Sequence, residues 1–457
     1  MKRILIQNAL LIDSLFQKRG DLLIEGEKIK RIAAKIELTT LPNETTVVDA
    51  SNLIVMPAVI DAHTHYHLVS RNSVTADSFY DGSKLAAFGG VTTVIDFADH
   101  DKSLSLLENG KVRISEMEKE MAIDFALHQG VYKVTDTIET ELKELVDYGI
   151  SAIKIFTTYK DVGYLIEIDL LKKLFEAAKK EKALITAHCE DDLVIQESLK
   201  NYKGDFNIKD HPLLRPSIAE AKAILQLGKL AKESDSPLYV VHLSSEAGLE
   251  AVRELRKEGV KVVVETTPHY LFLNNFYLEK EEGSLYLMTP PLREPSDNKA
   301  LQEALNNDEI DIVATDHCSF SKEQKQLSSD CRYVLPGIPG SEELFSLIFT
   351  HFDKDYKKVV ELLSSNVAKA FGLYPEKGSL EVGTDADLIL VDPKASYTIS
   401  SSTVHSKANY SPYDTFKVKG KIVQTYLRGK LIVDNSTFLG EKGEGKFVKA
   451  KVSSAFR

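Results

Sequence analysis

Cysteine is scarce in this 457-residue sequence, which contains only Cys189, Cys318 and Cys331. None of them lies in a C-x-x-C pair, and three thiols cannot all pair within one chain, so we expect reduced cysteines in a cytosolic protein. Long apolar runs are missing too, because no stretch approaches the ~20 apolar residues of a membrane helix. The apolar start of the chain is interrupted at Gln7 and Asn8, so we expect no signal peptide and a cytoplasmic location.

Basic residues are not in excess, since 57 lysines and arginines face 68 aspartates and glutamates, for a formal net charge of −11 at pH 7. An acidic chain without a dense basic stripe binds nucleic acid and membrane surfaces poorly, and we expect neither partner. Hydrophobic residues make up 43% and charged residues 27%, as in soluble globular proteins. The length exceeds what one hydrophobic core usually holds, which predicts one large and one smaller domain.

Short β-rich segments alternate with longer helical ones from about Pro57 onward. The β-rich segments comprise residues 59–65, 91–97, 123–132, 152–159, 184–190, 238–244, 261–270 and 310–318. Helical patterns between and after them include residues 76–88, 170–182, 218–232, 249–258 and 357–371. Eight strands that are each followed by a crossover predict an α/β fold, the (β/α)8 TIM barrel.

Both ends of the chain are β-rich without intervening helices. Strands are expected at residues 4–13, 21–32 and 46–55, and again at 379–393 and 417–435. Each flank is too short to bury a core alone, so we expect the two to pack together as one small β-sandwich domain. The predicted parts are residues 1–56 and 376–440 for the sandwich, 57–375 for the barrel and 441–457 for a polar tail.

The first predicted barrel strand ends in the sequence D-A-H-T-H, which contains His63 and His65. Residues two apart on a strand point to the same side, so both imidazoles can reach one metal ion. The carboxyl ends of the strands are also where a TIM barrel keeps its active site. Two structural histidines are the alternative interpretation of an isolated H-x-H.

Three more strand ends carry histidine or carboxylate side chains. His188 lies near the end of the fifth strand, His242 near the end of the sixth, and Asp316 and His317 near the end of the eighth. Any one of them can be a structural histidine or a helix-capping aspartate, but their coincidence at one rim favours a metal site. Imidazole and carboxylate are ligands that suit zinc and related divalent ions.

Lys154 lies inside an apolar strand, A-I-K-I-F, where a charged ammonium loses its hydration. One interpretation is a lysine whose head reaches out to a carboxylate. The functional interpretation is that the amine reacts with carbon dioxide to give a carbamate. The two carbamate oxygens can then bridge two metal ions that lie ~3.5–4 Å apart.

Seven specific motifs follow one another along the chain: D-A-H-T-H, T-A-D-S-F-Y-D-G-S-K-L-A-A-F-G-G-V-T-T-V-I-D-F, G-I-S-A-I-K-I-F-T-T-Y-K, Y-V-V-H-L-S-S, T-P-P-L-R, V-A-T-D-H-C and K-G-S-L-E-V-G-T-D-A-D-L-I-L. Through these motifs, residues 3–435 resemble the hydantoinase and dihydropyrimidinase family of the amidohydrolase superfamily. The resemblance implies a TIM barrel with a β-sandwich, two divalent zinc ions per subunit, a carboxylated lysine and a homotetramer. It also implies a cyclic amide substrate, whose ring amide or imide bond is hydrolysed through a metal-bridging hydroxide.

Site residues are carried over from the family only where its motifs match. The implied metal ligands are His63, His65, Lys154 as N6-carboxylysine, His188, His242 and Asp316. The first two histidines hold the more buried metal, the last two hold the outer metal, and the carbamate bridges both. Asp316 also serves as the general base, and Tyr159 donates a hydrogen bond to the substrate oxygen.

Three positions depart from the family pattern. Thr289 replaces the serine that commonly precedes P-P-L-R and whose backbone meets the substrate ring. Pro336 stands where dihydropyrimidine-opening members have asparagine, and proline has no N–H to donate. A proline–glycine turn with a purely structural role is the alternative interpretation of this position. His67 replaces an aspartate or, in dihydroorotases, an arginine, and it is interpreted as a loop histidine or as an additional metal ligand.

Two alternatives to hydantoin or dihydropyrimidine hydrolysis remain open. Allantoin or another cyclic ureide can be the substrate of the same metal centre. A non-catalytic oligomeric scaffold is the alternative from another class, since some relatives keep the fold and lose the metal ligands. All six ligand positions are filled in this sequence, which favours an enzyme.

Overall fold

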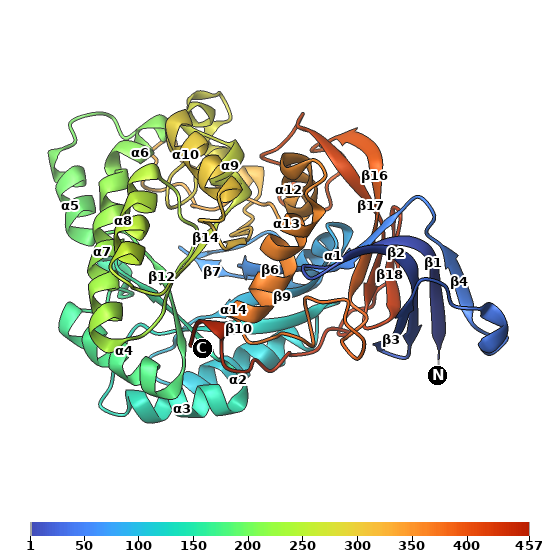
Figure 1. Ribbon diagram of the computed structural model, residues 1–457. Helices are drawn as coiled ribbons and strands as arrows, with labels where there is room; N and C mark the ends of the chain where they lie inside the picture. Colours follow the sequence, from blue (N-terminus) through green and yellow to red (C-terminus); the bar gives the residue numbers. More distant parts are fainter. Residues whose placement is uncertain (1, 457) are drawn as a thin grey trace.

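The computed structural model describes residues 2–456 and contains two large sheets that lie side by side (Figure 1). One sheet is surrounded by helices on the left of Figure 1, and the other forms the layer of strands on the right. Across residues 2–456, no helix is both long and apolar enough to cross a membrane.

The first sheet is a parallel barrel of eight strands in the order β15-β14-β13-β12-β11-β10-β9-β6. Its strands are β6 (Val59–Thr64), β9 (Val91–Ala98), β10 (Asp124–Gly130), β11 (Ala152–Phe156), β12 (Leu184–His188), β13 (Leu238–Val240), β14 (Val262–Thr266) and β15 (Ile312–Val313). A parallel bridge between Thr64 and His317 joins β6 to the chain just beyond β15. The predicted α/β barrel is therefore confirmed.

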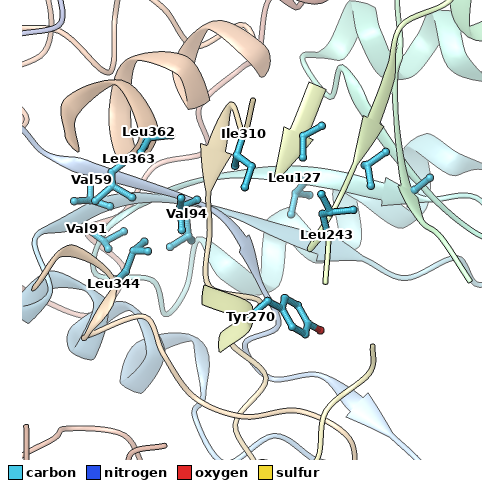
Figure 2. Close-up of a cluster of buried hydrophobic side chains, with 14 of the residues drawn as sticks. Val59, Val91, Val94, Leu127, Leu243, Tyr270, Ile310, Leu344, Leu362 and Leu363 are labelled. Carbon is cyan, nitrogen blue, oxygen red and sulfur yellow. The ribbon is translucent and has the colours of Figure 1, made fainter. Parts of the chain in front are cut away.

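Helices cover the outside of the barrel and bury its apolar face. They include α1 (Phe79–Phe88), α2 (Leu106–Met117), α3 (Ile138–Tyr148), α4 (Ile168–Glu181), α7 (Ser217–Ser234), α8 (Glu246–Lys257) and α10 (Pro295–Asn306). After β15 come α12 (Leu344–Phe352), α13 (Tyr356–Val360), a π-helical turn (Glu361–Ser365) and α14 (Asn366–Ala370). Figure 2 shows strand residues such as Val59, Val94 and Leu127 in the same apolar cluster as Leu344 and Leu362 from these helices.

Several barrel strands end earlier than the sequence predicts. Residues 241–244 and 314–318 lie beyond β13 and β15, because His242 and Asp316 adopt positive φ angles of 41° and 51° that interrupt the ladders. The prediction of strand through residues 267–270 is wrong, because α9 (Pro268–Phe272) begins there with proline at its first turn, where proline's missing N–H costs nothing.

The second sheet is formed by both ends of the chain. Its main path runs β19-β18-β17-β16-β5-β1-β2-β3, and β4 pairs with β1. The N-terminal strands are β1 (Arg3–Ile12), β2 (Gln17–Glu25), β3 (Lys28–Ala33), β4 (Thr46–Asp49) and β5 (Ile54–Pro57). The C-terminal strands are β16 (Leu388–Thr398), β17 (Lys417–Leu427), β18 (Lys430–Asp434) and β19 (Thr437–Phe438). Antiparallel pairing of β5 with β16 joins the two flanks, as the sequence predicts.

Beyond β19 the chain returns to the amino-terminal end of the barrel. The backbone N–H of Phe125, near the start of β10, donates to the Lys446 carbonyl at 3.0 Å, and the Val448 N–H donates to the Phe125 carbonyl at 2.8 Å. Phe456 packs against the apolar cluster that contains Phe371. Residues 441–456 thus lie along the end of the barrel opposite the predicted site.

Candidate metal centre and substrate loops

The predicted metal ligands gather at the carboxyl ends of the barrel strands. His63 lies on β6, Lys154 on β11 and His188 at the end of β12, while His242 lies two residues beyond β13 and Asp316 three residues beyond β15. Parallel strands bring these ends to one edge of the barrel. His63, His242 and Asp316 each offer a ligand atom, and these atoms all lie within 4.8 Å of one another.

One group of ligand atoms forms around Asp316. Its Oδ1 lies 3.2 Å from Nε2 of His63 and 3.2 Å from Nε2 of His65. The two histidine rings are 5.1 Å apart at their centroids, so the H-x-H spacing does aim both imidazoles at one point. Two imidazole nitrogens and one carboxylate oxygen are donors that suit a zinc-like cation.

A second group consists of His188 and His242. Nδ1 of His188 lies 3.0 Å from Nε2 of His242, and both side chains are buried. The ring centroids of His63 and His242 are 5.4 Å apart, so this group lies directly beside the first. The structure therefore brings five of the six predicted ligands into two adjacent sets of converging donor atoms.

Lys154, the sixth predicted ligand, lies between the two groups. Its Nζ is 5.0 Å from the centroid of Phe97 and 5.2 Å from that of Phe156. Phe97 also contacts the rings of His63 and His65, whereas Phe156 contacts the ring of His188. Within residues 2–456 no carboxylate forms an ion pair with this ammonium, and burial lowers the pKa of Lys154 to about 8. Across the described residues, Lys154 therefore lacks the carboxylate partner that the salt-bridge interpretation requires.

The buried histidines are held in the neutral form that metal ligation requires. Burial lowers the pKa of His63 and of His242 well below the ordinary value, and neighbouring positive charge from Lys154 lowers both further. Burial also lowers the pKa of His188, although the adjacent Glu190 opposes this shift. At neutral pH these imidazoles keep a lone pair available for a cation.

Two buried glutamates bind the candidate histidine ligands at the ring nitrogens that point away from the cluster. Neither glutamate was singled out as functional from the sequence. Glu265 on β14 accepts hydrogen bonds from His63 Nδ1 at 2.8 Å, from the His242 backbone N–H at 3.0 Å and from the Tyr239 hydroxyl at 2.7 Å. Burial raises the pKa of Glu265 to about 8, and the Tyr239 hydroxyl, the Lys154 ammonium and the His242 N–H each oppose that shift. A carboxylate on the far nitrogen of a histidine fixes which nitrogen faces the metal.

Glu190 has the same relation to the second group. Its Oε2 lies 2.7 Å from Nε2 of His188, and Arg215 binds it through Nη2 at 2.6 Å. The Arg215 guanidinium also lies over the ring of Tyr159, 5.1 Å from its centroid. The sequence offers one signal for such residues, namely glutamates that lie within or just after apolar strands, as in V-V-V-E-T and I-T-A-H-C-E.

The predicted substrate residues lie on loops beside the ligands. Tyr159 follows β11 with a φ of 65°, its ring centroid is 5.5 Å from that of His188, and the Thr289 side chain interacts with its phenol. Burial raises the pKa of Tyr159, so the phenol keeps its proton at neutral pH. The Pro336 carbonyl lies 3.9 Å from Cys318 Sγ, on a loop that leads back toward the barrel.

The remaining histidines of the motifs are not brought into the cluster. His67 is exposed, has a φ of 47° and packs against Phe79 with ring centroids 5.4 Å apart. His317 points the other way from its neighbour Asp316, with Nε2 3.0 Å from Asp77 and with Nδ1 accepting from Gly340 N–H at 3.1 Å. Both therefore shape loops of the site, and neither supplies a ligand atom to it.

Comparisons with known proteins agree with this geometry. Residues 54–432 match the model of the amidohydrolase family. The chain is 35% identical to a D-hydantoinase of Ralstonia pickettii, across 98% of this chain and 99% of the relative. It is 34% identical to a D-hydantoinase of Rhizobium radiobacter, again across 98% and 99%. The crystal structure of dihydropyrimidinase from Brevibacillus agri NCHU1002 has a TM-score of 0.94 with this chain at 32% identity, and the match covers 99% of both chains.

Proposed function

The chain belongs to the amidohydrolase family, within its hydantoinase and dihydropyrimidinase branch, and from this membership we propose that it hydrolyses the ring amide of hydantoins or dihydropyrimidines. In this reaction the ring C–N bond breaks, the hydroxyl of water joins the carbonyl carbon, and a proton is added to the ring nitrogen. Relatives named for hydantoin and dihydropyrimidine favour these substrates over allantoin.

The observation that carries the proposal is the pair of adjacent donor groups at the barrel rim. His63, His65 and Asp316 form one, and His188 and His242 form the other. Neutral imidazoles and a carboxylate fit two divalent cations, and zinc suits this donor set. When bound, two such cations lower the pKa of water and polarise the carbonyl that it attacks.

We assign Lys154 as the bridging ligand, in the form of a carbamate. The unprotonated amine is the nucleophile toward carbon dioxide, and a pKa of about 8 makes part of the Lys154 population unprotonated near neutral pH. A C–N bond forms between Nζ and the carbon of carbon dioxide, and the amine releases a proton to solvent. The product is an anion with two oxygens, placed between the two histidine groups where Phe97 and Phe156 now flank the ammonium.

The protein's own groups move the protons and hold the substrate. Asp316 accepts a proton from the attacking water and returns it to the leaving ring nitrogen. The Tyr159 phenol, kept protonated by burial, donates a hydrogen bond to the carbonyl oxygen as negative charge develops there. The backbones of Thr289 and Pro336 contact the ring, and the proline contributes a carbonyl without an N–H.

We also propose that the enzyme is a cytoplasmic homo-oligomer, a tetramer by analogy with its family. Its three cysteines are free and buried, which fits a reducing compartment. Leu193, Leu213 and Ile218 are 74%, 61% and 57% exposed on one flank of the barrel, and apolar groups of this kind are commonly covered in oligomers. Light scattering that finds a monomer at micromolar concentration contradicts the oligomer.

A substrate panel tests the proposed activity. The metal-loaded protein is assayed against hydantoin, 5-substituted hydantoins, dihydrouracil, allantoin and dihydroorotate, and products are identified by mass spectrometry. We expect ring opening of hydantoins or dihydrouracil and none with Asp316→Asn, which cannot accept the proton. Turnover of allantoin alone moves the assignment to another cyclic ureide hydrolase, and turnover of none of the five contradicts it.

A further inference from the structure

Lys325 is a fully buried lysine that none of the metal-centre chemistry uses. It is the last residue of α11 (Lys322–Lys325), a short helix that Ser321 caps. Its Nζ donates to three backbone carbonyls: Leu287 at 2.7 Å, Leu335 at 3.0 Å and Gly337 at 2.7 Å. An ammonium has three N–H groups, so each of them has a partner.

The three carbonyls belong to the two loops that carry the predicted substrate contacts. Leu287 lies two residues before Thr289, and Leu335 and Gly337 flank Pro336 on either side. The Gly337 N–H also donates to the Leu287 carbonyl at 3.0 Å, so the two loops meet directly beside the ammonium. Lys325 thus fixes the orientation of the Leu335–Pro336 and Gly337–Ile338 peptide groups, which lie on either side of Pro336 in the loop.

Lysine is almost never fully buried in proteins unless a group of opposite charge pairs with it. Across residues 2–456 no carboxylate forms an ion pair with Lys325, and burial lowers its pKa to about 7. Burial of the Lys325 ammonium is therefore unfavourable in itself, and its contacts stabilise the geometry of the two loops. The helix that carries it is itself anchored, since Gln324 Nε2 donates to Ser73 Oγ and to the Val74 carbonyl, both at 2.8 Å.

We propose that Lys325 is a positioning residue, which sets the spacing between the Thr289 and Pro336 backbones and thereby the fit of the cyclic amide between them. This inference rests on the proposed function of the two loops. Lys325 touches neither the substrate nor the metal ligands, and it acts through the main chain of both loops. Its removal weakens substrate binding while the metal centre stays intact.

The test compares Lys325→Met with a matched control, Lys377→Met. Lys377 is also a buried lysine, but it binds Asp124, Asp385 and Asp387 at the opposite end of the barrel. For both variants we measure metal content, KM, kcat and the hydrogen exchange of residues 285–290 and 334–340. Lys325→Met is expected to keep its metal, to exchange faster in both segments and to raise KM about tenfold, the factor that one lost hydrogen bond to substrate gives.

The control is expected to lower the melting temperature with wild-type KM and wild-type exchange in these segments. Unchanged KM in Lys325→Met, with or without faster exchange, overturns the proposal, and so does an equal rise of KM in Lys377→Met. If Lys325→Met does not fold, Gly337→Ala replaces it. Gly337 has a φ of 139°, and a Cβ there would lie 2.6 Å from the Cys318 carbonyl oxygen, so the loop must move while the lysine stays. In that case a wild-type KM overturns the proposal. Should the wild-type protein open no cyclic amide, the proposed function fails, and unchanged exchange in Lys325→Met then separately overturns the loop-positioning role.

Discussion

Replacing Glu265 by glutamine tests whether the buried carboxylates behind the histidines organise the metal centre. The substitution keeps the size of the side chain and removes its charge. Glu265 is 0% exposed and serves three donors, His63 Nδ1, the His242 backbone and the Tyr239 hydroxyl. A glutamine has one oxygen and one NH2 group, so it cannot accept from all three as the carboxylate does.

The size of the effect follows from which donor loses its acceptor. If the NH2 group faces His63, Nδ1 must become the acceptor, and the proton moves to Nε2, the nitrogen aimed at Asp316. If the NH2 group faces Tyr239, the tautomer survives but the carboxylate charge is lost. Loss of such an outer partner typically weakens metal binding by about 10–100-fold, or about 1.4–2.7 kcal/mol.

Competition with a chromophoric chelator measures this change in metal affinity directly. Tyr239→Phe is the control, because it removes only the hydroxyl at 2.7 Å from Glu265 and leaves the contacts to His63 and His242 in place. We expect the control to lose about 1 kcal/mol of stability and to lose less than the roughly 10-fold in metal affinity that marks the loss of an outer partner. Wild-type metal affinity in Glu265→Gln, or an equal loss in both variants, would refute the reasoning.

Three further predictions concern single residues. Lys154→Ala should lose metal and activity, with partial rescue by formate or acetate, and Lys154→Arg should do no better because it cannot form a carbamate; near-normal turnover of Lys154→Arg would exclude the carbamate. Tyr159→Phe should lower kcat by about 10²–10³-fold, the usual cost of a lost oxyanion donor, and steady-state kinetics should show KM and metal content near wild type; an unchanged kcat would remove Tyr159 from the reaction. Burial lowers the pKa of His128 from 6.5 to about 3, so the unfolded state binds more protons within that range and the metal-free protein loses stability as pH falls, by up to about 1.4 kcal/mol per pH unit for this residue. Urea unfolding at several pH values should therefore show that the free energy of unfolding changes less steeply with pH in His128→Gln than in wild type. An equal slope would contradict the lowered pKa of His128.

Most of the barrel was predictable because its strands are buried on both faces and read as apolar runs. The helices were predictable because apolar residues recur in them at helical spacing. Helix α1 starts at Phe79 rather than at residue 76, because the Ser78 side chain caps it by accepting a hydrogen bond from the Asp81 N–H. The early ends of β13 and β15 were not predictable, because His242 and Asp316 take positive φ angles that no local pattern requires. Such backbone strain is found where surrounding structure holds a functional group in place.

Some residues of the candidate metal centre were likewise predictable from the sequence, and others were not. Strand-end position and alternation identified the ligand candidates His63, His188 and Asp316, and the structure places each of them beside another candidate. The pairing of Glu190 with Arg215 spans 25 residues, and no sequence period links the two. The Lys325 contacts are to backbone carbonyls, which carry no side-chain signal in the sequence.

Ring opening in isotopically labelled water tests the central claim most directly. Metal-loaded protein is incubated with hydantoin or dihydrouracil in ¹⁸O-water, and the product is followed by mass spectrometry before and after chelation. The metal centre that we propose at His63, His65, Lys154, His188, His242 and Asp316 predicts a product heavier by one molecule of labelled water, with the label in the new carboxylate. Chelation should abolish this product, and added zinc should restore it. Protein that carries its metals and leaves every ring intact, or that opens rings equally well after complete chelation, would contradict the account.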